Sequence, residues 1–505
     1  MGMGFLVDYR PLGAVLISLV AAALIMLSKQ HPKLQQGWTI LAAVGKVVLV
    51  FSMLPEVLAG KILEVEPFFI AEGITLHLRA DTTGMIFALL ASVLWVLTSF
   101  YSFGYLRKQE KTHQTGYYAS FAVCLSATMG IAFAANLLTF FVFYEILTIA
   151  TYPLVVHNRD EESIKAGRKY LVYTLVAGQL FLIGIVWAQF TAGTGDFRPG
   201  GFLAGTAPNG ALQLIFLLMI LGTAVKAGVM PLHGWLPAAM VAPTPVSALL
   251  HAVAVVKAGA FGIIRIVGFV FGPQLLGELG VAEVLAWFAA FTIIVSSLIA
   301  LGQDNLKRRL AFSTVGQLSY IVLGCSLLTP LALVGGMYHI VAHAVMKITL
   351  FFCAGAIYIT THLTKVSQLK GIGRQMPYTM AAFTVGSLGI TGLPFIVGFI
   401  SKWNLASGAV QGGQAFYLVV LVLSALLSAA YFIPIVYAAF FQEPEGELAE
   451  HYYGEADKLM LVPLLLTAAV SVIWGVFPNA GAHLYDLAAM SAQSIVNGQF
   501  IVGGW

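Results

Sequence analysis

Long apolar segments, separated by short polar loops, follow one another along almost the whole chain. A helix that crosses the hydrocarbon core of a bilayer needs about 20 mostly apolar residues, and the chain contains about fourteen such segments. Their approximate cores are 11–28, 38–60, 83–105, 117–135, 137–157, 170–192, 212–232, 246–271, 283–302, 310–328, 331–360, 378–408, 415–441 and 460–478. The pattern predicts an all-α polytopic membrane protein.

Glycine and proline interrupt two of these spans. The interrupting residues are Gly222, Gly228 and Pro231 in the seventh span, and Gly389, Gly392, Pro394 and Gly398 in the twelfth. Proline removes a backbone donor and clashes with the preceding turn, so both helices are expected to break. Paired broken helices in inverted halves are typical of transporters whose site lies near the membrane midplane.

The distance of five spans between the two breaks predicts an inverted five-helix repeat. The first repeat would hold helices 4 to 8 in residues 117–271, and the second would hold helices 9 to 13 in residues 272–441. Helices 1 to 3 precede them in residues 1–116. An acidic loop, helix 14 and a tail follow in residues 442–505.

The composition agrees with a membrane protein and excludes other classes. Hydrophobic residues make up 59% of the chain and charged residues 10%, and the mean hydropathy is +0.90, whereas a soluble domain carries about 25% charged residues. A net charge of +4 with dispersed basic residues gives no sign of nucleic acid binding. The three cysteines lie far apart, without the spacing of a metal or dithiol site. We therefore expect no nucleic acid partner, no metal site and no cofactor.

Lysine and arginine are unevenly distributed between alternate loops. One set of loops holds only Arg10, Lys61, Arg79 and Arg198, while the other holds most of the remaining basic residues. The richer set is expected on the cytoplasmic side, which places the N-terminus outside. The first apolar run lacks a small-residue cleavage pattern, so we expect a retained span. The predicted location is the cell inner (cytoplasmic) membrane.

Six basic residues lie inside predicted spans, namely Lys46, Lys226, Lys257, Arg265, Lys347 and Lys402, and one acidic residue, Glu145, lies well inside a span. A charge at the centre of a span costs about 2.5 to 3.5 kcal/mol on insertion scales, and such residues usually serve a function. The structural alternative is a lysine that snorkels to the interface. Arginine keeps its proton at accessible pH, so Arg265 is expected to be an anchor. Lys46 is likewise interpreted as structural.

Glu145 is the natural partner of a buried lysine. No second carboxylate lies well inside a span, so this chain offers no oxygen cage for a hard cation. A nearby ammonium favours a charged carboxylate, and the carboxylate in turn keeps the lysine protonated. A glutamate and a lysine whose separation changes would therefore act as a proton switch.

Histidines supply a second group of candidates. His339, His343 and Lys347 in "MYHIVAHAVMKITLFF" are spaced by four residues, which places them on one helix face. Imidazole titrates near neutral pH and can both accept and donate a proton, so the face predicts a relay. A zinc site is the alternative for the two histidines, but this helix carries no third ligand. His251, six residues before Lys257, is expected to link the seventh span to the relay.

These residues lie in segments that together resemble the proton-translocating antiporter family. The segments are "FYEILTIATYPLVV", "VKAGVMPLHGWLPAAMVAPTPVSALLHAVAVVKAG", "DNLKRRLAFSTVGQLSY", "YHIVAHAVMKITLFF" and "GLPFIVGFISKW". The family includes the antiporter-like subunits of respiratory complex I, large subunits of Mrp-type multi-subunit sodium/proton antiporters, and membrane subunits of related hydrogenases. The resemblance covers nearly the whole chain. It implies fourteen helices with an inverted repeat, and membership of a larger complex.

The resemblance also implies a role for each matching position. The switch glutamate and its partner lysine fall on Glu145 and Lys226, and the central lysine falls on Lys257. The relay residues fall on His339, His343 and Lys347, and the outer-half lysine falls on Lys402. One branch has glutamate at this last position, so Lys402 disfavours that branch. The chain also stops soon after its fourteenth span, and it is most similar to the smaller antiporter subunit of the Mrp type, the D subunit.

The sequence therefore predicts a proton-translocating subunit of a hetero-oligomeric membrane complex. Protons would pass along a central Glu/Lys/His axis from Lys226 to Lys257, the histidine face, Lys347 and Lys402. The predicted assembly is a sodium/proton antiporter, with other membrane subunits and the lipid bilayer as partners.

Several alternatives remain at this point. The chain could instead serve a complex I-like or hydrogenase oxidoreductase, or an inorganic carbon uptake complex. A structural subunit without transport and a self-contained solute carrier are further alternatives. No nucleotide loop or nucleophile elbow is apparent in the sequence, so the enzyme class stays open.

Overall fold

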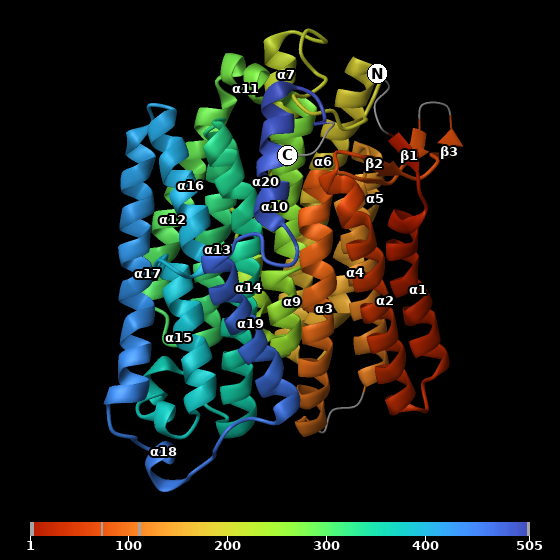
Figure 1. Cartoon of the computed structure of the whole chain (residues 1–505). Helices are drawn as coiled ribbons and strands as arrows, with labels where there is room; N and C mark the ends of the chain where they lie inside the picture. The colour runs from red at the N-terminus through yellow and green to blue at the C-terminus, as the bar shows by residue number, and fades with distance from the viewer. Residues whose placement is uncertain (1–4, 72–73, 110–112, 502–505) are drawn as a thin grey trace.

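The computed structural model describes residues 5–71, 74–109 and 113–501, and helices dominate this part of the chain. The helices are α1 (Arg10–Leu27), α2 (Pro32–Leu58), α3 (Thr82–Lys108), α4 (Gln114–Phe133), α5 (Leu137–Val155), α6 (Glu161–Ala192), α7 (Asn209–Ala227), α8 (Trp235–Ala238), η1 (Ala239–Val241), α9 (Thr244–Ala252), α10 (Val255–Arg265), η2 (Ile266–Phe271), α11 (Pro273–Leu279), α12 (Val281–Leu301), α13 (Leu306–Ser326), α14 (Pro330–Thr361), η3 (Val366–Gln368), η4 (Ile372–Arg374), α15 (Pro377–Thr391), α16 (Val397–Gln411), α17 (Ala415–Phe441), α18 (Glu447–Glu450), α19 (Lys458–Val476) and α20 (Leu484–Asn497). The long helices run side by side as one bundle (Figure 1).

The bundle confirms a polytopic membrane protein. Within the described residues, twelve helical segments are long and apolar enough to cross a membrane. The tenth predicted span corresponds to α13, whose first turn carries Lys307, Arg308 and Arg309. The twelfth predicted span corresponds to α15 and α16, each of 15 residues. Together these elements account for the fourteen expected spans, while the predicted domain boundaries and the orientation in the membrane stay predictions.

Both predicted helix breaks are present, and a third one occurs in the eighth span. The seventh span ends as a helix at Ala227, and the twelfth is interrupted between Thr391 and Val397. The eighth span, which was expected to be continuous over 246–271, breaks between α9 and α10 and continues into the π-helix η2. This unexpected break lies beside Lys257.

The purely helical prediction needs two corrections outside the spans. In the described part of the chain, five short strands lie near the N-terminal end of the bundle: β1 (Phe5–Val7), β2 (Ile62–Glu64), β3 (Phe68–Ala71), β4 (Ile74–Leu76) and β5 (Arg79–Ala80). Strand β2 pairs in parallel with β1 and antiparallel with β5, and β3 and β4 form a hairpin. The predicted tail contains α20, which packs against α3 and α14.

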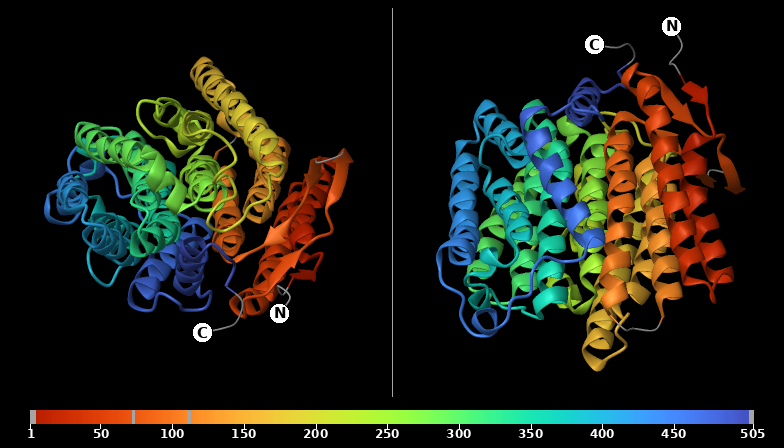
Figure 2. Two further views of the ribbon diagram at one scale, coloured as in Figure 1. Left: turned by 90° about the horizontal axis from the view of Figure 1, so that it is seen from above. Right: turned by 60° about the horizontal axis from the view of Figure 1, so that its bottom comes forward.

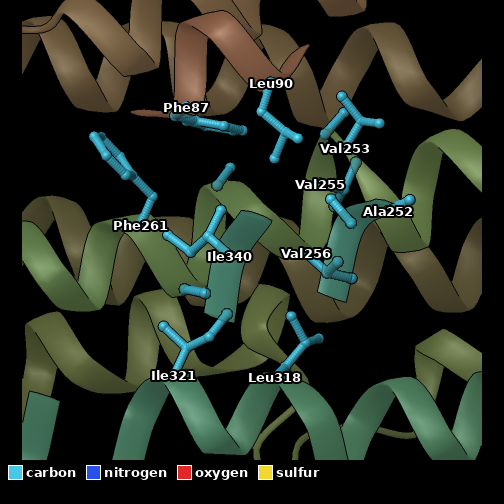
Figure 3. Packing of buried hydrophobic residues seen from close by; sticks show 14 of the residues in the cluster. Phe87, Leu90, Ala252, Val253, Val255, Val256, Phe261, Leu318, Ile321 and Ile340 are labelled. Atoms are coloured by element: carbon cyan, nitrogen blue, oxygen red, sulfur yellow. The ribbon is translucent and has the colours of Figure 1, made fainter. Parts of the chain in front are cut away.

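The centre of the bundle is formed by α14 and by the segment from α9 to η2, whose most apolar stretches are completely buried. The red and orange N-terminal helices lie at one end of the molecule, and the blue helices α16 and α17 lie at the other (Figure 2). Apolar side chains from α3, α10, α13 and α14 fill the space around the break in the eighth span (Figure 3), and the rings of Phe87 and Phe261 lie 5.2 Å apart. Charged groups at this depth are therefore shielded from bulk water.

A buried ion pair joins α3 to α10. The guanidinium of Arg265 donates to both carboxylate oxygens of Asp81, at 2.6 and 2.9 Å. Asp81 also accepts a hydrogen bond from the Gly84 amide and so caps the N-terminus of α3. Three aromatic rings, of Phe197, Phe261 and Phe269, lie within 5.2 Å of the guanidinium carbon. These contacts agree with the expectation that Arg265 is an anchor.

Candidate functional site

Lys226 lies at the end of α7, next to the helix break. The chain turns at Gly228, whose φ of 71° favours glycine, and the Trp235 indole donates to the Val225 carbonyl at 2.7 Å. The Lys226 side chain is buried, and its ammonium donates to the Tyr144 carbonyl of α5 at 2.6 Å. The C-terminal end of a helix carries partial negative charge, which attracts an ammonium.

Glu145 lies half-buried on α5, with its carboxylate against α6. A Cβ atom added to Gly178 of α6 would lie 2.4 Å from the Glu145 Oε1 atom, so the absence of a side chain there makes room for the carboxylate. Among the described residues, Oε1 has no hydrogen-bond partner, and no ion pair directly joins Glu145 to Lys226. The predicted contact pair is not formed here. The two charges interact through space, and the Tyr144 carbonyl holds the ammonium.

Gly178→Ala is expected to slow proton transport about tenfold. The added methyl group would push the carboxylate away, and a change of about 1.36 kcal/mol in its interaction with the ammonium corresponds to a factor of ten. Proton uptake into inverted membrane vesicles measures the effect. Gly184→Ala is the matched control, because on the same helix its Cβ atom would lie 2.7 Å from the Met219 Cγ atom and 3.2 Å from the Met219 amide nitrogen, so it crowds a neighbouring helix without touching a carboxylate. Equal losses in both variants would contradict a specific role of the carboxylate.

Lys257 lies in the first turn of α10, directly after the unexpected break. The N-terminal end of a helix carries partial positive charge, which repels an ammonium. The side chain is completely buried, and its Nζ atom lies 2.8 Å from the Nδ1 atom of His343. An ammonium can only donate, and a protonated Nδ1 atom can only donate too. This contact therefore excludes the state in which both atoms are protonated, and one of the two nitrogens donates a hydrogen bond to the other.

A close approach of α10 to α7 brings the first two lysines to the same helix crossing. A Cβ atom added to Gly259 would lie 2.3 Å from the Ala227 amide nitrogen, so only glycine allows this contact. Gly259 is two residues from Lys257, and Ala227 follows Lys226 directly. The structure therefore brings the two predicted stations to one place in the bundle.

His343 and His339 continue the line along α14. Their ring centroids lie 6.2 Å apart. The Nδ1 atom of His339 lies 2.8 Å from the Ser401 hydroxyl oxygen, and its Nε2 atom lies 3.2 Å from the Gln317 amide oxygen. The Tyr320 ring stacks on the imidazole at a centroid distance of 5.2 Å. The sequence did not point to Gln317, Tyr320 or Ser401 as site residues.

Lys402 lies on the far side of Tyr320. Its ammonium donates to the carbonyl groups of Ile390 and Thr391, which end α15, the second of these bonds being 3.2 Å long. The same ammonium lies 5.1 Å from the centroid of the Tyr320 ring. Lys402 is therefore adjacent to the His339 end of the histidine face, as a basic group held at the C-terminus of a broken helix.

Lys347 lies in a different direction from the one predicted. Its ammonium donates to the Ser313 hydroxyl at 2.7 Å and to the Leu310 carbonyl at 3.2 Å, and Tyr431 in turn donates to Ser313. On α14, Lys347 follows His343, whereas the neighbours of Lys402 surround His339. In this structure Lys347 does not lie between the histidines and Lys402, and its place in the predicted proton route stays a prediction.

Two further interpretations concern histidines, namely His251 as a link to the relay and a zinc site. His251 on α9 packs its ring 5.0 Å from that of Phe351, and neither ring nitrogen has a hydrogen-bond partner in the described part of the chain. Its predicted role as a link stays a prediction. Over residues 5–71, 74–109 and 113–501, no group of three or more His, Cys, Asp or Glu side chains is placed to hold a metal ion. The geometry thus lends the zinc alternative no support.

A polar cavity of about 730 Å³ lies where α8, η1 and the start of α9 meet the first turn of α13. Lys169, His233 and Lys307 contribute to its lining, and Lys307 donates to the Ala242 carbonyl at 2.7 Å. The cavity reaches Thr244, seven residues before His251, which is about 10 Å along a helix axis. The cavity therefore ends about 10 Å from His251 along α9, and buried residues of this helix lie between them.

Comparisons with known proteins agree with this fold. Residues 134–428 match the family described as "NADH:quinone oxidoreductase/Mrp antiporter, TM". The "NADH-quinone oxidoreductase subunit N" of Desulforudis audaxviator is 33% identical over 408 residues, which cover 77% of this chain and 81% of that protein. The D subunit of the Na(+)/H(+) antiporter of Alkalihalophilus pseudofirmus is 26% identical over 469 residues, which cover 91% and 92%. A chain of the Mrp complex from Dietzia sp. DQ12-45-1b has a TM-score of 0.85 at 20% identity, over 97% of this chain and 99% of that chain.

A helical bundle with paired broken helices and an internal row of lysines and histidines defines an antiporter-like membrane protein. The chain belongs to the NADH:quinone oxidoreductase/Mrp antiporter family. It is an antiporter-like subunit, and the structures with the same fold come from multi-subunit membrane complexes. The resemblance found in the sequence is thereby confirmed at the level of the family.

Proposed function

We propose that this chain translocates protons as a subunit of a sodium/proton antiporter in the cytoplasmic membrane. The contact of 2.8 Å between the Lys257 Nζ atom and the His343 Nδ1 atom carries the proposal, because two buried bases joined by a hydrogen bond can pass a proton on. The likeness to the antiporter protein of Alkalihalophilus pseudofirmus, over nearly the whole length of both chains, supports the choice of an antiporter.

The proposed route joins the buried bases from α7 through α10 and α14 to α16. A proton held on Lys226 passes through water to Lys257, then to His343 and His339, and leaves towards Lys402. Lys226 lies at the C-terminal end of a helix and Lys257 at an N-terminal end, so the first step moves the charge against the local helix dipoles. A movement of Glu145 away from Lys226 removes one attraction that holds the proton on Lys226.

The change in proton affinity that the first step requires is comparable to the free energy that a membrane potential supplies. A proton that crosses 100 mV exchanges about 2.3 kcal/mol, and one pKa unit corresponds to about 1.36 kcal/mol. A change of about two units in the proton affinity of Lys226 is therefore enough to couple the step to an external driving event. A neighbouring subunit that displaces α5 or α6 would supply this event.

A second function is favoured by one observation. The relative with 33% identity is a subunit of an NADH-quinone oxidoreductase, so the same row of residues would serve a redox-driven pump. In that case the proton route is unchanged, and the driving reaction takes place in other subunits.

The two functions are distinguished by what drives proton movement in everted vesicles that contain the complete complex. For an antiporter, sodium added to vesicles with a preformed pH gradient is expected to collapse that gradient, as a fluorescent pH probe reports. Lys257→Met in the same complex is expected to abolish the response. A complex that ignores sodium and acidifies the vesicles only with a reductant and a quinone would contradict the antiporter and favour the oxidoreductase.

A further inference from the structure

The two ring nitrogens of His339 have partners of different chemistry. Nε2 lies 3.2 Å from the amide oxygen of Gln317, which can only accept, so Nε2 carries a proton. Nδ1 lies 2.8 Å from the hydroxyl oxygen of Ser401, which can either donate or accept. With these partners in place, Nδ1 is the nitrogen that can gain and lose a proton.

A second contact of Ser401 lets the His339 imidazole keep its hydrogen bonds in both protonation states. The Ser401 hydroxyl oxygen also lies 3.0 Å from the Gly398 carbonyl, three residues earlier in α16. When His339 is neutral, the hydroxyl donates to Nδ1. When His339 is charged, Nδ1 donates to the hydroxyl oxygen, and the hydroxyl proton turns to the Gly398 carbonyl. No heavy atom has to move between the two states.

We propose that Gln317 and Ser401 make His339 a proton store that titrates through a single nitrogen. Gln317 keeps Nε2 protonated, and the Ser401 hydroxyl rotates between Nδ1 and the Gly398 carbonyl as the stored proton leaves and arrives. Both are positioning residues, because they act through the imidazole. The proposal rests on the proposed function in one respect, namely that the stored proton is a transported one.

His343 is held differently, which gives the two histidines separate tasks. Its Nδ1 atom contacts the Lys257 ammonium, and its Nε2 atom has no partner among the described residues. The Nδ1 atom of His343 can therefore exchange a proton with Lys257, and no hydrogen bond among the described residues fixes a proton on Nε2. His343 passes the proton, and His339 holds it next to Lys402.

The surroundings of His339 explain why it needs two oxygen partners. The titratable groups that face it are Lys257 of α10, His343 of α14, Tyr320 of α13 and Lys402 of α16. Three of these groups become cationic when protonated, so a charged imidazole is repelled from several sides. The oxygens of Gln317 and Ser401 offset this repulsion, because hydrogen bonds to a charged group are stronger than those to a neutral one.

Nitrogen-15 NMR of the histidine-labelled full chain in lipid bilayers tests the assignment without any transport measurement. The His339 signals are identified as those that disappear in His339→Gln. At alkaline pH we expect neutral His339 with its proton on Nε2 and with Nδ1 unprotonated. The opposite tautomer, with the proton on Nδ1, would overturn the proposal even if the chain transports protons normally. The expected tautomer in a chain that transports no protons would leave the store intact and refute only the proposed function.

The pH profile of transport tests the role of Ser401. In Ser401→Ala the charged imidazole loses a stronger hydrogen bond than the neutral one, so the alkaline limb of the profile is expected to move about one unit to lower pH. Ser401→Thr keeps a hydroxyl group and should restore the original limb. The control is Ser387→Ala on α15, because the buried Ser387 hydroxyl has no hydrogen-bond partner among the described residues, and this change should leave the profile unaltered. A Ser401→Ala profile that coincides with the wild type, or an equal shift in Ser387→Ala, would overturn the proposal.

Discussion

Proton transport is expected to fall at least about a hundredfold when Lys257 is replaced by methionine. Methionine fills a similar volume in the buried space around α10 but has no exchangeable proton, so the hydrogen bond with His343 is lost. A positioned proton donor or acceptor contributes about 10² to 10⁴ in rate. Proton flux into vesicles that contain the complete complex measures the loss, with the amount of assembled complex determined in parallel.

Lys46→Met is the matched control for this replacement. The Lys46 side chain is also completely buried, and its ammonium donates to the Leu125 carbonyl at 3.1 Å and lies 4.7 Å from the centroid of a Trp95 ring. It belongs to α2, away from the row of bases on α7, α10, α14 and α16. Transport by Lys46→Met should stay close to that of the wild type. If Lys257→Met transports protons as well as Lys46→Met does, the central axis is not the route.

The largest effect on stability is expected from Asp81→Asn. The replacement leaves the Arg265 guanidinium buried without a counter-charge, and breaking a buried ion pair from one side costs about 3–5 kcal/mol. Asparagine is as good a helix N-cap as aspartate, so the cap on α3 is retained and the loss reports the charge alone. Denaturant unfolding of the purified chain in detergent measures the change in the free energy of unfolding.

A double replacement and a second ion pair serve as controls. Asp81→Asn combined with Arg265→Met removes both charges, and it should cost less than the sum of the two single changes because the residues are coupled. Glu161→Gln affects the exposed ion pair with Lys165 on α6, and the expected loss there is about 1 kcal/mol or less. Equal losses in Asp81→Asn and Glu161→Gln would show that burial does not strengthen the α3–α10 link.

The helices and two of the three breaks could be predicted because their signals are local. Apolar runs of sufficient length gave the spans, and the glycines and prolines around Gly228 and Gly392 gave the breaks. The break between α9 and α10 has no such signal, because "LLHAVAVVKAG" contains no proline and its glycine comes after the break. Tertiary packing produces this break, so a single segment of sequence cannot reveal it.

The bases of the site were predictable, whereas their partners were not. A lysine or histidine in an apolar helix is easily noticed in the sequence, because its insertion into the membrane costs free energy. Lys257 and His343 stand out for this reason. Gln317 and Ser401 are ordinary polar residues in the sequence, and they gain meaning only because α13 and α16 pack against α14 at the level of His339. The contacts of Lys347 with Ser313 and Leu310 could not be predicted for the same reason, since helix spacing does not tell which neighbouring helix each face meets.

Lys226 and Lys402, the lysines at two of the broken helices, both donate to main-chain carbonyl groups, those of Tyr144, Ile390 and Thr391. The kind of acceptor affects which substitutions related chains can carry. A carbonyl group is present whatever side chain the residue carries, so substitutions at these positions leave the acceptors in place. Where homologues keep these lysines, we expect the residues at the three acceptor positions to vary without a correlated change at the lysine, so a search for correlated substitutions would overlook the contacts.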